Sequence, residues 1–302
     1  MIKVKRIKVF EKLNSILTDF CQEFQLTEEK TIERIQAYEE HFNREDSVYF
    51  LATADEVPKG FMSCDITEKI IQTNRLFVKK CEEYDEVIYE LISQVSKQLE
   101  SLKKEFLQIF FVTSLKVKQK LIENDFAVYP RVKMVYDLKE NQIPEFRLNP
   151  DYQLSYFTLD KLDEELLIIV DANKNHIDGE IFRQFSNLDI LRKFFFRSNK
   201  DISRVRTDSP IILKDDKIVG INIVINLSDT ASYIWIIALL PEYRGKGLGK
   251  YLMLKAHENC QKANVDQMIL DVTVDNFIAF NLYKKLGYKE TMRYLTVLKK
   301  YL

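Results

Sequence analysis

The sequence predicts an α/β (α+β) protein made of two tandem lobes of similar size. Its 302 residues are about the length of two ordinary domains. The sequence also contains a weak internal repeat, in which residues 75–138 align without a gap with residues 237–300, at an offset of 162 residues. Both copies present the same order of expected elements: strand, long amphipathic helix, strand, short helix, strand.

The second copy shows these elements most clearly. A β-branched and aromatic run over 233–240 predicts a buried strand, which Pro241 ends. After it we expect a helix over 248–261, a strand over 267–274, a short helix over 277–286 and a strand over 294–298. Gly287 stands where helices favour a C-terminal glycine cap. The segment 141–150 holds two of the six prolines and has no clear period, so we expect the lobes at 1–143 and 144–302.

Composition excludes several classes of protein. Lys and Arg number 45 against 46 Asp and Glu, and this balance gives no basic surplus for binding nucleic acid. The four cysteines form no C-x-x-C pair and the three histidines have no metal-ligand spacing, so we expect no disulfide framework and no metal site. The longest apolar run is too short for a membrane helix, and the N-terminus alternates like a strand rather than a signal peptide. We therefore expect a cytoplasmic protein, with a monomer as a plausible state.

A glycine-rich loop is the main functional signal. Three of the seven glycines are Gly245, Gly247 and Gly249, between the strand that Pro241 ends and the next helix. The first N–H groups of a helix lack partners within it and carry part of the positive end of the helix dipole. Glycines let a ligand approach these donors, and Arg244 and Lys246 add positive charge. The pattern predicts a site for a ligand that bears a diphosphate.

The spacing distinguishes this loop from other phosphate-binding loops. It lacks the G-x-x-x-x-G-K-[ST] pattern of a Walker loop and the glycine and acidic positions of a dinucleotide fingerprint. The pattern Arg-x-x-Gly-x-Gly after a strand and proline resembles the acetyl-CoA signature of the GNAT superfamily of N-acyltransferases. The resemblance implies lobes with a mixed, mostly antiparallel central sheet flanked by helices. It implies acetyl-CoA as co-substrate, bound by Ile237, Ala238, Leu239, Arg244, Gly245, Lys246, Gly247, Leu248, Gly249, Lys250 and Asn276.

A second motif supports the resemblance. Residues 281–288 give the family's N-x-Y-x-x-x-G-[FY] ending, which makes Tyr283 the candidate general acid for the leaving CoA thiolate. The alternative for Tyr283 is a tyrosine packed in the core. Asn276 resembles the residue that contacts the pantetheine arm, and a helix-capping role is its alternative. By position, residues 237–239 resemble the segment that pairs with the pantetheine amides and binds the thioester oxygen as charge develops.

The general base is left open. The strand over 233–240 has no carboxylate, where many relatives carry a glutamate. Glu180, Asp208, Glu242 and Asp271 are acidic residues that could lie near the cleft. A water chain, or attack by a substrate amine with a depressed pKa, could serve instead. The expected function is transfer of an acetyl group from acetyl-CoA to a primary amine of an unidentified acceptor, by direct attack on the thioester. The alternative is a non-catalytic CoA-binding or interaction protein with the same fold.

The first copy has lost these motifs. Glu82 replaces Arg244, Asp85 replaces Gly247 and Leu121 replaces Tyr283. Residues 82–86 hold four carboxylates where a diphosphate would bind, and like charges repel. We therefore expect a degenerate first lobe without a CoA site, as in the tandem-GNAT proteins, of which mycothiol synthase is an example.

Overall fold

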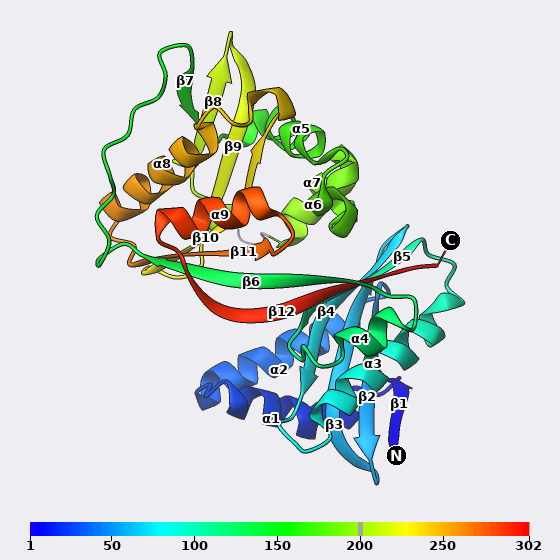
Figure 1. Ribbon diagram of the computed structural model, residues 1–302. Coiled ribbons are helices and arrows are strands. Elements are labelled where there is room, and N and C mark those ends of the chain that lie inside the picture. The colour runs from blue at the N-terminus through cyan, green and yellow to red at the C-terminus, as the bar shows by residue number, and fades with distance from the viewer. Residues whose placement is uncertain (199–201, 302) are drawn as a thin grey trace. The chain divides into compact units, whose positions relative to one another are not determined.

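The computed structural model describes residues 1–198 and 202–301, which form two compact units (Figure 1). Unit 1 consists of Met1–Pro130 and Arg293–Leu302, and unit 2 of Arg131–Met292.

Unit 1 is a sheet with helices on both faces. Its strands lie in the order β1-β2-β3-β4-β5-β12, with a single parallel neighbour pair, β4 and β5, among the register pairs of its described residues. Helices α1 and α2 pack on one face and α3 and α4 on the other. The elements are β1 (Ile2–Ile7), α1 (Asn14–Glu23), α2 (Glu28–Phe42), β2 (Ser47–Ala54), β3 (Val57–Ile66), β4 (Ile70–Val78), α3 (Tyr84–Glu100), β5 (Phe106–Val112), α4 (Lys118–Ile122) and the last part of β12 (Lys289–Lys300).

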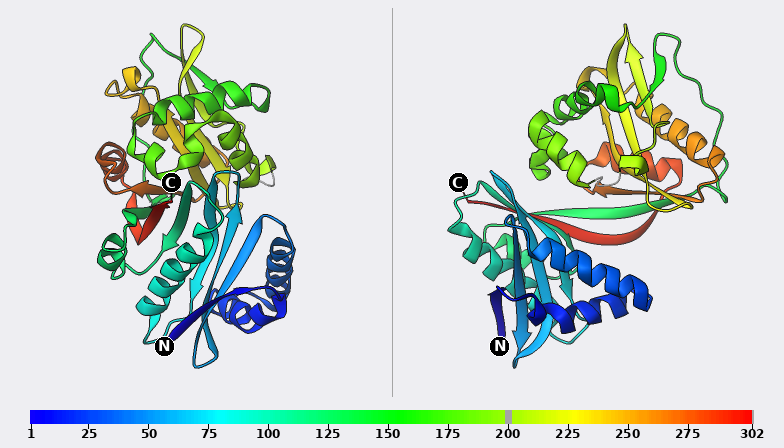
Figure 2. Two further views of the ribbon diagram at one scale, coloured as in Figure 1. Left: turned by 90° about the vertical axis from the view of Figure 1, so that its right-hand side faces the viewer. Right: turned by 180° about the vertical axis from the view of Figure 1, so that it is seen from behind.

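Unit 2 has the same construction, with the strand order β6-β11-β10-β9-β8-β7. Figure 2 shows α5, α6 and α7 on one face of this sheet and α8 and α9 on the other. The elements are β6 (Ala127–Asp137), β7 (Gln153–Tyr156), α5 (Leu162–Asn173), α6 (Ile177–Ile181), α7 (Leu188–Ser198), β8 (Pro210–Lys214), β9 (Lys217–Asn226), β10 (Ala231–Leu239), α8 (Leu248–Lys262), β11 (Gln267–Thr273) and α9 (Phe277–Leu286). The mixed sheets flanked by helices confirm the predicted fold class.

The element bounds also confirm the repeat. An offset of 162 residues carries β5 to 268–274, one residue from β11, and carries β6 to 289–299, which is β12 within one residue. The same offset carries the last residue of α3 to the last residue of α8, and the first residues of the two helices then differ by two positions. The two copies therefore share one order of strands and helices, although their residues differ at most positions.

One strand of each copy lies in the other unit. Strand β6 belongs to the first copy, yet its residues 131–137 pair with β11 in unit 2. Strand β12 ends the second copy, yet its residues Leu295 and 297–300 pair with β5 in unit 1. The division at 1–143 and 144–302 follows the sequence repeat and stays a prediction about its two copies, whereas the compact units follow the exchanged strands.

Alternation along the central strand of unit 2 decides which face the site residues occupy. Met268, Leu270 and Val272 of β11 are buried in the core against α8 and α9. The intervening residues, Asp271 among them, face the side of the sheet that α5, α6 and α7 cover. In the ranges 1–198 and 202–301, no helix combines the length and the apolar character needed to cross a bilayer.

Candidate functional site

The glycine loop leaves strand β10 and enters helix α8. A short 3-10 turn over Pro241–Tyr243 follows the strand, and Gly247 is the N-cap of α8. Gly245 and Gly247 have φ angles of +75° and +80°, a region that glycine adopts without strain. A Cβ atom at either position would meet no heavy atom within 4 Å. These two glycines are therefore required by backbone conformation, and the space beside them is open.

The first turn of α8 presents backbone donors. Its first N–H bond runs from Tyr251 to the Gly247 carbonyl oxygen at 3.0 Å, and no side chain caps the helix. The N–H groups of Leu248, Gly249 and Lys250 thus have no acceptor within the helix. Gly249 has ordinary space, since a Cβ there would lie 3.4 Å from Leu239. Three adjacent donors at a helix N-terminus suit a phosphate group.

The charged side chains of the loop have different roles. The Arg244 guanidinium donates through Nε to the Leu239 carbonyl oxygen at 3.2 Å, and through Nη2 to the Ala172 carbonyl oxygen at 2.5 Å. Arg244 therefore ties the loop to the end of α5. Lys246 and Lys250 are exposed, and the Lys246 ammonium lies 5.1 Å from the centre of the Tyr243 ring.

Strands β10 and β11 separate beside this loop. They pair in parallel only over 231–233 and 267–269, although β10 runs on to Leu239 and β11 to Thr273. The register of β10 against β9 shifts between Ile234 and Ile236, which marks a bulge where the strands part. One edge of β10 is consequently unpaired with β11 over its second half.

The backbone N–H and C=O groups of the three predicted residues of β10, 237–239, point to different edges of the strand. The Leu240 N–H donates to the Val219 carbonyl oxygen at 3.1 Å, so by the alternation of an antiparallel ladder Ala238 bonds to β9. Ile237 and Leu239 then direct their N–H and C=O groups to the other edge. The Leu239 carbonyl is taken by Arg244. The remaining polar groups of Ile237 and the Leu239 N–H suit pairing with an extended amide chain.

Tyr283 lies on α9 inside the core. Its side chain is only 5% exposed. Burial raises the pKa of the Tyr283 phenol, and the Asp178 carboxylate raises it further, while Arg131 lowers it. The phenol therefore stays protonated at neutral pH and retains a proton to donate. The core packing that was the predicted alternative is thus observed, and proton donation by Tyr283 stays a prediction.

Asn276 caps α9 and joins a part-buried hydrogen-bond network. Its Oδ1 accepts from the Ala279 N–H at 3.2 Å, and its Nδ2 donates to Asp178 Oδ2 at 2.8 Å. Thr273 donates to the other Asp178 oxygen at 2.8 Å. The capping alternative is thus observed. Sequence reasoning missed Asp178, because its partners lie almost 100 residues away along the chain.

The four candidate carboxylates have unequal environments. Glu180 and Glu242 are exposed, and Asp208 forms an ion pair with Arg206 at 2.6 Å. The Asp271 side chain is only 3% exposed. Its Oδ2 accepts from the Tyr233 hydroxyl and the Lys133 ammonium, both at 2.9 Å, and its Oδ1 has no partner.

The corresponding loop of the first copy is occupied by its own side chains. Asp85 in the first turn of α3 accepts from the Ser114 hydroxyl at 2.6 Å and pairs with Lys116 at 3.2 Å. Ser114 takes the repeat position of Asn276, and the fully buried Leu121 takes that of Tyr283. The first turn of α3 is therefore already supplied with negative charge.

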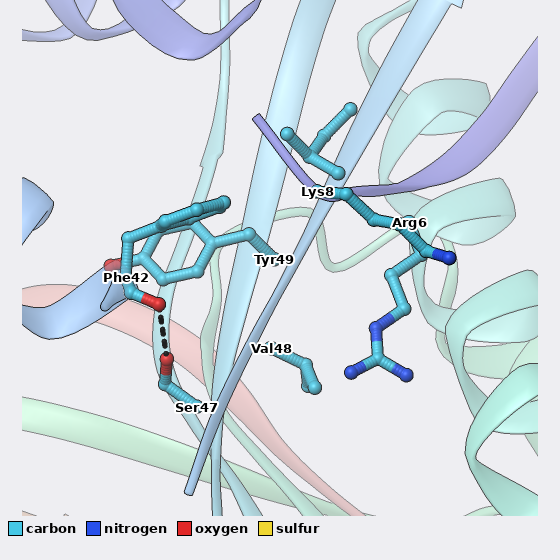
Figure 3. A pocket seen from close by; sticks show the side chains of 7 residues that line it. Arg6, Lys8, Phe42, Ser47, Val48 and Tyr49 are labelled. Atoms are coloured by element: carbon cyan, nitrogen blue, oxygen red, sulfur yellow. Dashed lines mark hydrogen bonds between the residues drawn. The ribbon is translucent and has the colours of Figure 1, made fainter. Parts of the chain in front are cut away.

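A separate pocket of about 450 Å³ lies in unit 1 (Figure 3). It contains none of the predicted site residues. Its lining consists of Arg6, Ile7, Lys8, Phe42, Ser47, Val48 and Tyr49.

Part of the chain is similar in sequence to known proteins. The family model described as the acetyltransferase (GNAT) family matches residues 179–288. The chain is 33% identical over 89 residues to mycothiol acetyltransferase of Corynebacterium efficiens, which is 30% of each chain. It is 42% identical over 55 residues to an N-alpha-acetyltransferase of Sulfurisphaera tokodaii, covering 18% of this chain and 33% of that one. The chain spans between 30% and 50% of the length of the curated relatives it matches.

Solved structures match the whole chain at low identity. A tandem GNAT protein from the clavulanic acid biosynthesis pathway has a TM-score of 0.61 at 10% identity, over 100% of this chain and 99% of that chain. A GCN5-related N-acetyltransferase from Sphaerobacter thermophilus has a TM-score of 0.65 at 13% identity, over 99% and 96%. At such identities the likeness concerns the fold. The chain thus has the tandem GNAT fold, and its residues 179–288 form a domain of the GNAT acetyltransferase family.

Proposed function

We propose that this protein transfers an acetyl group from acetyl-CoA to a primary amine, by direct attack of the amine on the thioester. One observation carries the proposal: the unpaired edge of β10 leads directly into the unsatisfied first turn of α8. An extended amide chain can pair with the strand edge, and a diphosphate at its end can then reach the start of the helix. The pantetheine arm and the diphosphate of CoA are joined in this order.

The residues of unit 2 divide the binding between them. The N–H groups of 248–250 bind the diphosphate, with Lys246 and Lys250 supplying charge. Ile237 and Leu239 pair with the amides of the pantetheine arm. Leu248 contributes through its backbone, because its side chain is buried in the core, whereas the backbone of Ala238 is bonded to β9 and only holds the strand in place.

Two residues then move protons. Asp271 accepts a proton from the attacking ammonium through its unpartnered oxygen, while Tyr233 and Lys133 hold the other oxygen. The amine nitrogen forms a bond to the thioester carbon, and the carbon–sulfur bond breaks. Tyr283 donates its proton to the departing sulfur. The nitrogen then releases its second proton, which restores the Tyr283 phenol, and Asp271 releases the first proton to solvent. The products are an N-acetyl amine and the free thiol of CoA.

We further propose that the chain has one cofactor site. The repeat position in unit 1 carries Asp85 in place of Gly247, and that carboxylate already accepts from Ser114 at the helix start. A second anion at this helix start would be repelled.

The names of the relatives suggest a first class of acceptor. Among the curated matches are N-alpha-acetyltransferases of Sulfurisphaera tokodaii and Saccharomyces cerevisiae. We propose the α-amine of a peptide N-terminus as the first class to test, with amino sugars and polyamines as the comparison classes.

The experiment measures two quantities on the full chain. Calorimetric titration gives the affinity for acetyl-CoA, and thiol release gives turnover with each amine class. We expect saturable binding, and turnover that falls about 10-fold to 1,000-fold in Tyr283→Phe and in Asp271→Asn while binding changes little.

Two outcomes would count against the proposal. Absence of acetyl-CoA binding contradicts the cofactor site. Acetyl-CoA binding without turnover of any amine, with the same result in Tyr283→Phe, favours the alternative of a non-catalytic CoA-binding protein.

A further inference from the structure

The short helix α6 carries one carboxylate to the start of α9. We propose that Asp178 is a positioning residue, which holds the N-terminus of α9 and thereby sets the position of Tyr283. The proposal deepens the proposed function, since it rests on Tyr283 as the proton donor. All residues involved lie in unit 2.

The Asp178 carboxylate joins two neighbouring points of the chain. Its Oδ1 accepts from the Thr273 hydroxyl at 2.8 Å, at the last residue of β11. Its Oδ2 accepts from Asn276 Nδ2 at 2.8 Å, at the N-cap of α9. Both contacts are hydrogen bonds to an ionised group, which are stronger than bonds between neutral groups. The turn between β11 and α9 is therefore fixed at both ends by a single side chain.

This contact also selects the orientation of the Asn276 amide. An asparagine amide has a donor side and an acceptor side, and only one rotamer satisfies a carboxylate and an N–H group together. With Nδ2 on Asp178, Oδ1 faces the Ala279 N–H and caps the helix. Without the Asp178 carboxylate, the Asn276 amide loses the acceptor that fixes its orientation. The cap of α9 is then weaker, and we expect its first turn to lose order.

A second chain of hydrogen bonds balances the charge of Asp178. Because Thr273 donates its hydroxyl proton to Asp178, its oxygen is free to accept from Arg131 Nη1 at 3.1 Å. Arg131 is 7% exposed, and its guanidinium carbon lies 4.7 Å from the centre of the Phe182 ring, next to α6. The part-exposed Asp178 carboxylate and the buried Arg131 guanidinium are thus linked through one hydroxyl.

The backbone of α6 holds Asp178 in place. A Cβ atom on Gly179 would lie 2.2 Å from the Asn173 carbonyl oxygen, so only glycine allows α6 to pack on the end of α5. The same end of α5 supplies the Ala172 carbonyl to Arg244 of the glycine loop. The end of α5 therefore contacts both the phosphate-binding loop and the segment that orients α9.

The test compares Asp178→Ala and Asp178→Asn with the control Glu164→Gln, which removes an exposed carboxylate of α5. Amide hydrogen exchange in 277–281 reports the order of the first turn of α9 and needs no acceptor. Steady-state kinetics with the acceptor found in the amine panel give kcat and KM separately.

We expect faster exchange in 277–281 in both Asp178 variants and a fall in kcat of roughly 10-fold to 100-fold, with KM for acetyl-CoA within about 2-fold. Glu164→Gln should match the unsubstituted protein. In a Tyr283→Phe background, Asp178→Ala should lower kcat by less than about 3-fold, because the two residues act through one proton transfer.

The outcomes separate this inference from the proposed function. Unchanged exchange in 277–281 in Asp178→Ala contradicts the positioning role, whatever the kinetics show. A full additional loss of kcat in the Tyr283→Phe background also contradicts it, because Asp178 would then act independently of Tyr283. Failure of the unsubstituted protein to acetylate any amine contradicts the proposed function and is read from a different measurement.

Discussion

The Arg244 guanidinium donates a hydrogen bond of 2.5 Å to the Ala172 carbonyl oxygen in the last turn of α5. It also donates to Leu239 at the end of β10. Carbonyl groups of a last helical turn lack partners within the helix, and a cation there suits the helix dipole. The arginine of the loop motif is thus a structural link between three elements, in addition to its charge near the proposed phosphate site.

Arg244→Ala should therefore lower both stability and cofactor affinity. Loss of two charged hydrogen bonds predicts a fall in unfolding free energy of about 1–3 kcal/mol. Arg244→Lys keeps the charge and lacks the planar fork that reaches two carbonyls. Urea unfolding and acetyl-CoA titration check this prediction. A lysine variant equal to the original in both measurements would show that charge alone matters.

The loop glycine Gly247 and the cap glycine Gly287 form a matched pair for a second prediction. Both have positive φ, +80° and +101°. Alanine at either position should cost about 1–2 kcal/mol of unfolding free energy, because the left-handed conformation strains a Cβ atom. Only Gly247 lies at the proposed phosphate site, so Gly247→Ala should also weaken acetyl-CoA binding.

The control for this pair is Gly287→Ala, which should lose stability and keep its affinity. Thermal unfolding and calorimetry of the two variants give both quantities. Equal affinities in the two variants would show that the ligand does not approach the Gly247 Cα.

Local sequence features explain how much of this architecture was predictable. Pro241 and Gly287 mark element ends, and the repeat at an offset of 162 residues predicted the order of elements in both copies. The exchange of β6 and β12 was not predictable, because strand pairing joins residues far apart and either partner would bury the same apolar side chains.

In the site too, features that are local in sequence were predictable and contacts between distant residues were not. The glycine loop was predictable because its chemistry is contiguous in sequence. Asp178 was not, because it lies on a helix of five residues and its partners are 95 and 98 residues away. Asp271 was one of several equal carboxylates in the sequence, and only burial between Tyr233 and Lys133 distinguishes it.

Glu165 of α5 gives a third prediction, for the dependence of stability on pH between 4.5 and about 7. It is buried, its Oε1 accepts from the Thr158 N–H at 3.0 Å, and its Oε2 has no partner. Burial raises the pKa of the Glu165 carboxyl from 4.5 to about 7. Between these values the native state holds a proton that the unfolded state has released, so stability falls as pH rises from 4.5 to about 7 and is level above.

Glu165→Gln keeps the acceptor oxygen and cannot ionise. It should be more stable than the original at pH 8, by on the order of 3 kcal/mol, with little advantage at pH 4.5. Urea unfolding across this range measures the difference. A constant difference between the two proteins at every pH would show that Glu165 does not titrate in the folded state.

His257 of α8 predicts the opposite dependence of stability on pH: its contribution is lost as pH falls below 6.5. Its ring is fully buried, stacks on Tyr136 at 4.2 Å, and shares a hydrogen bond of 2.9 Å with the Tyr288 hydroxyl. Its Nδ1 has no partner, and burial lowers the pKa of the imidazole from 6.5 to about 3. In this window the unfolded state binds a proton that the native state excludes. The stability from His257 is therefore complete above pH 6.5 and is lost as pH falls toward 3.

His257→Gln should remove this acid sensitivity while lowering stability at pH 8 through poorer packing. Glu165 titrates with the opposite sign between pH 4.5 and 6.5, so the comparison is made in the Glu165→Gln background. In that background, the free energy of unfolding of the parent should fall by about 1.4 kcal/mol per pH unit below pH 6.5 because of His257. The slope of the double variant should be smaller by that amount. Because other carboxylates also titrate below pH 5, the slope between pH 5 and 6.5 decides the result. Equal slopes in the two proteins over that interval would mean that His257 gains its proton in the folded state near its ordinary pKa.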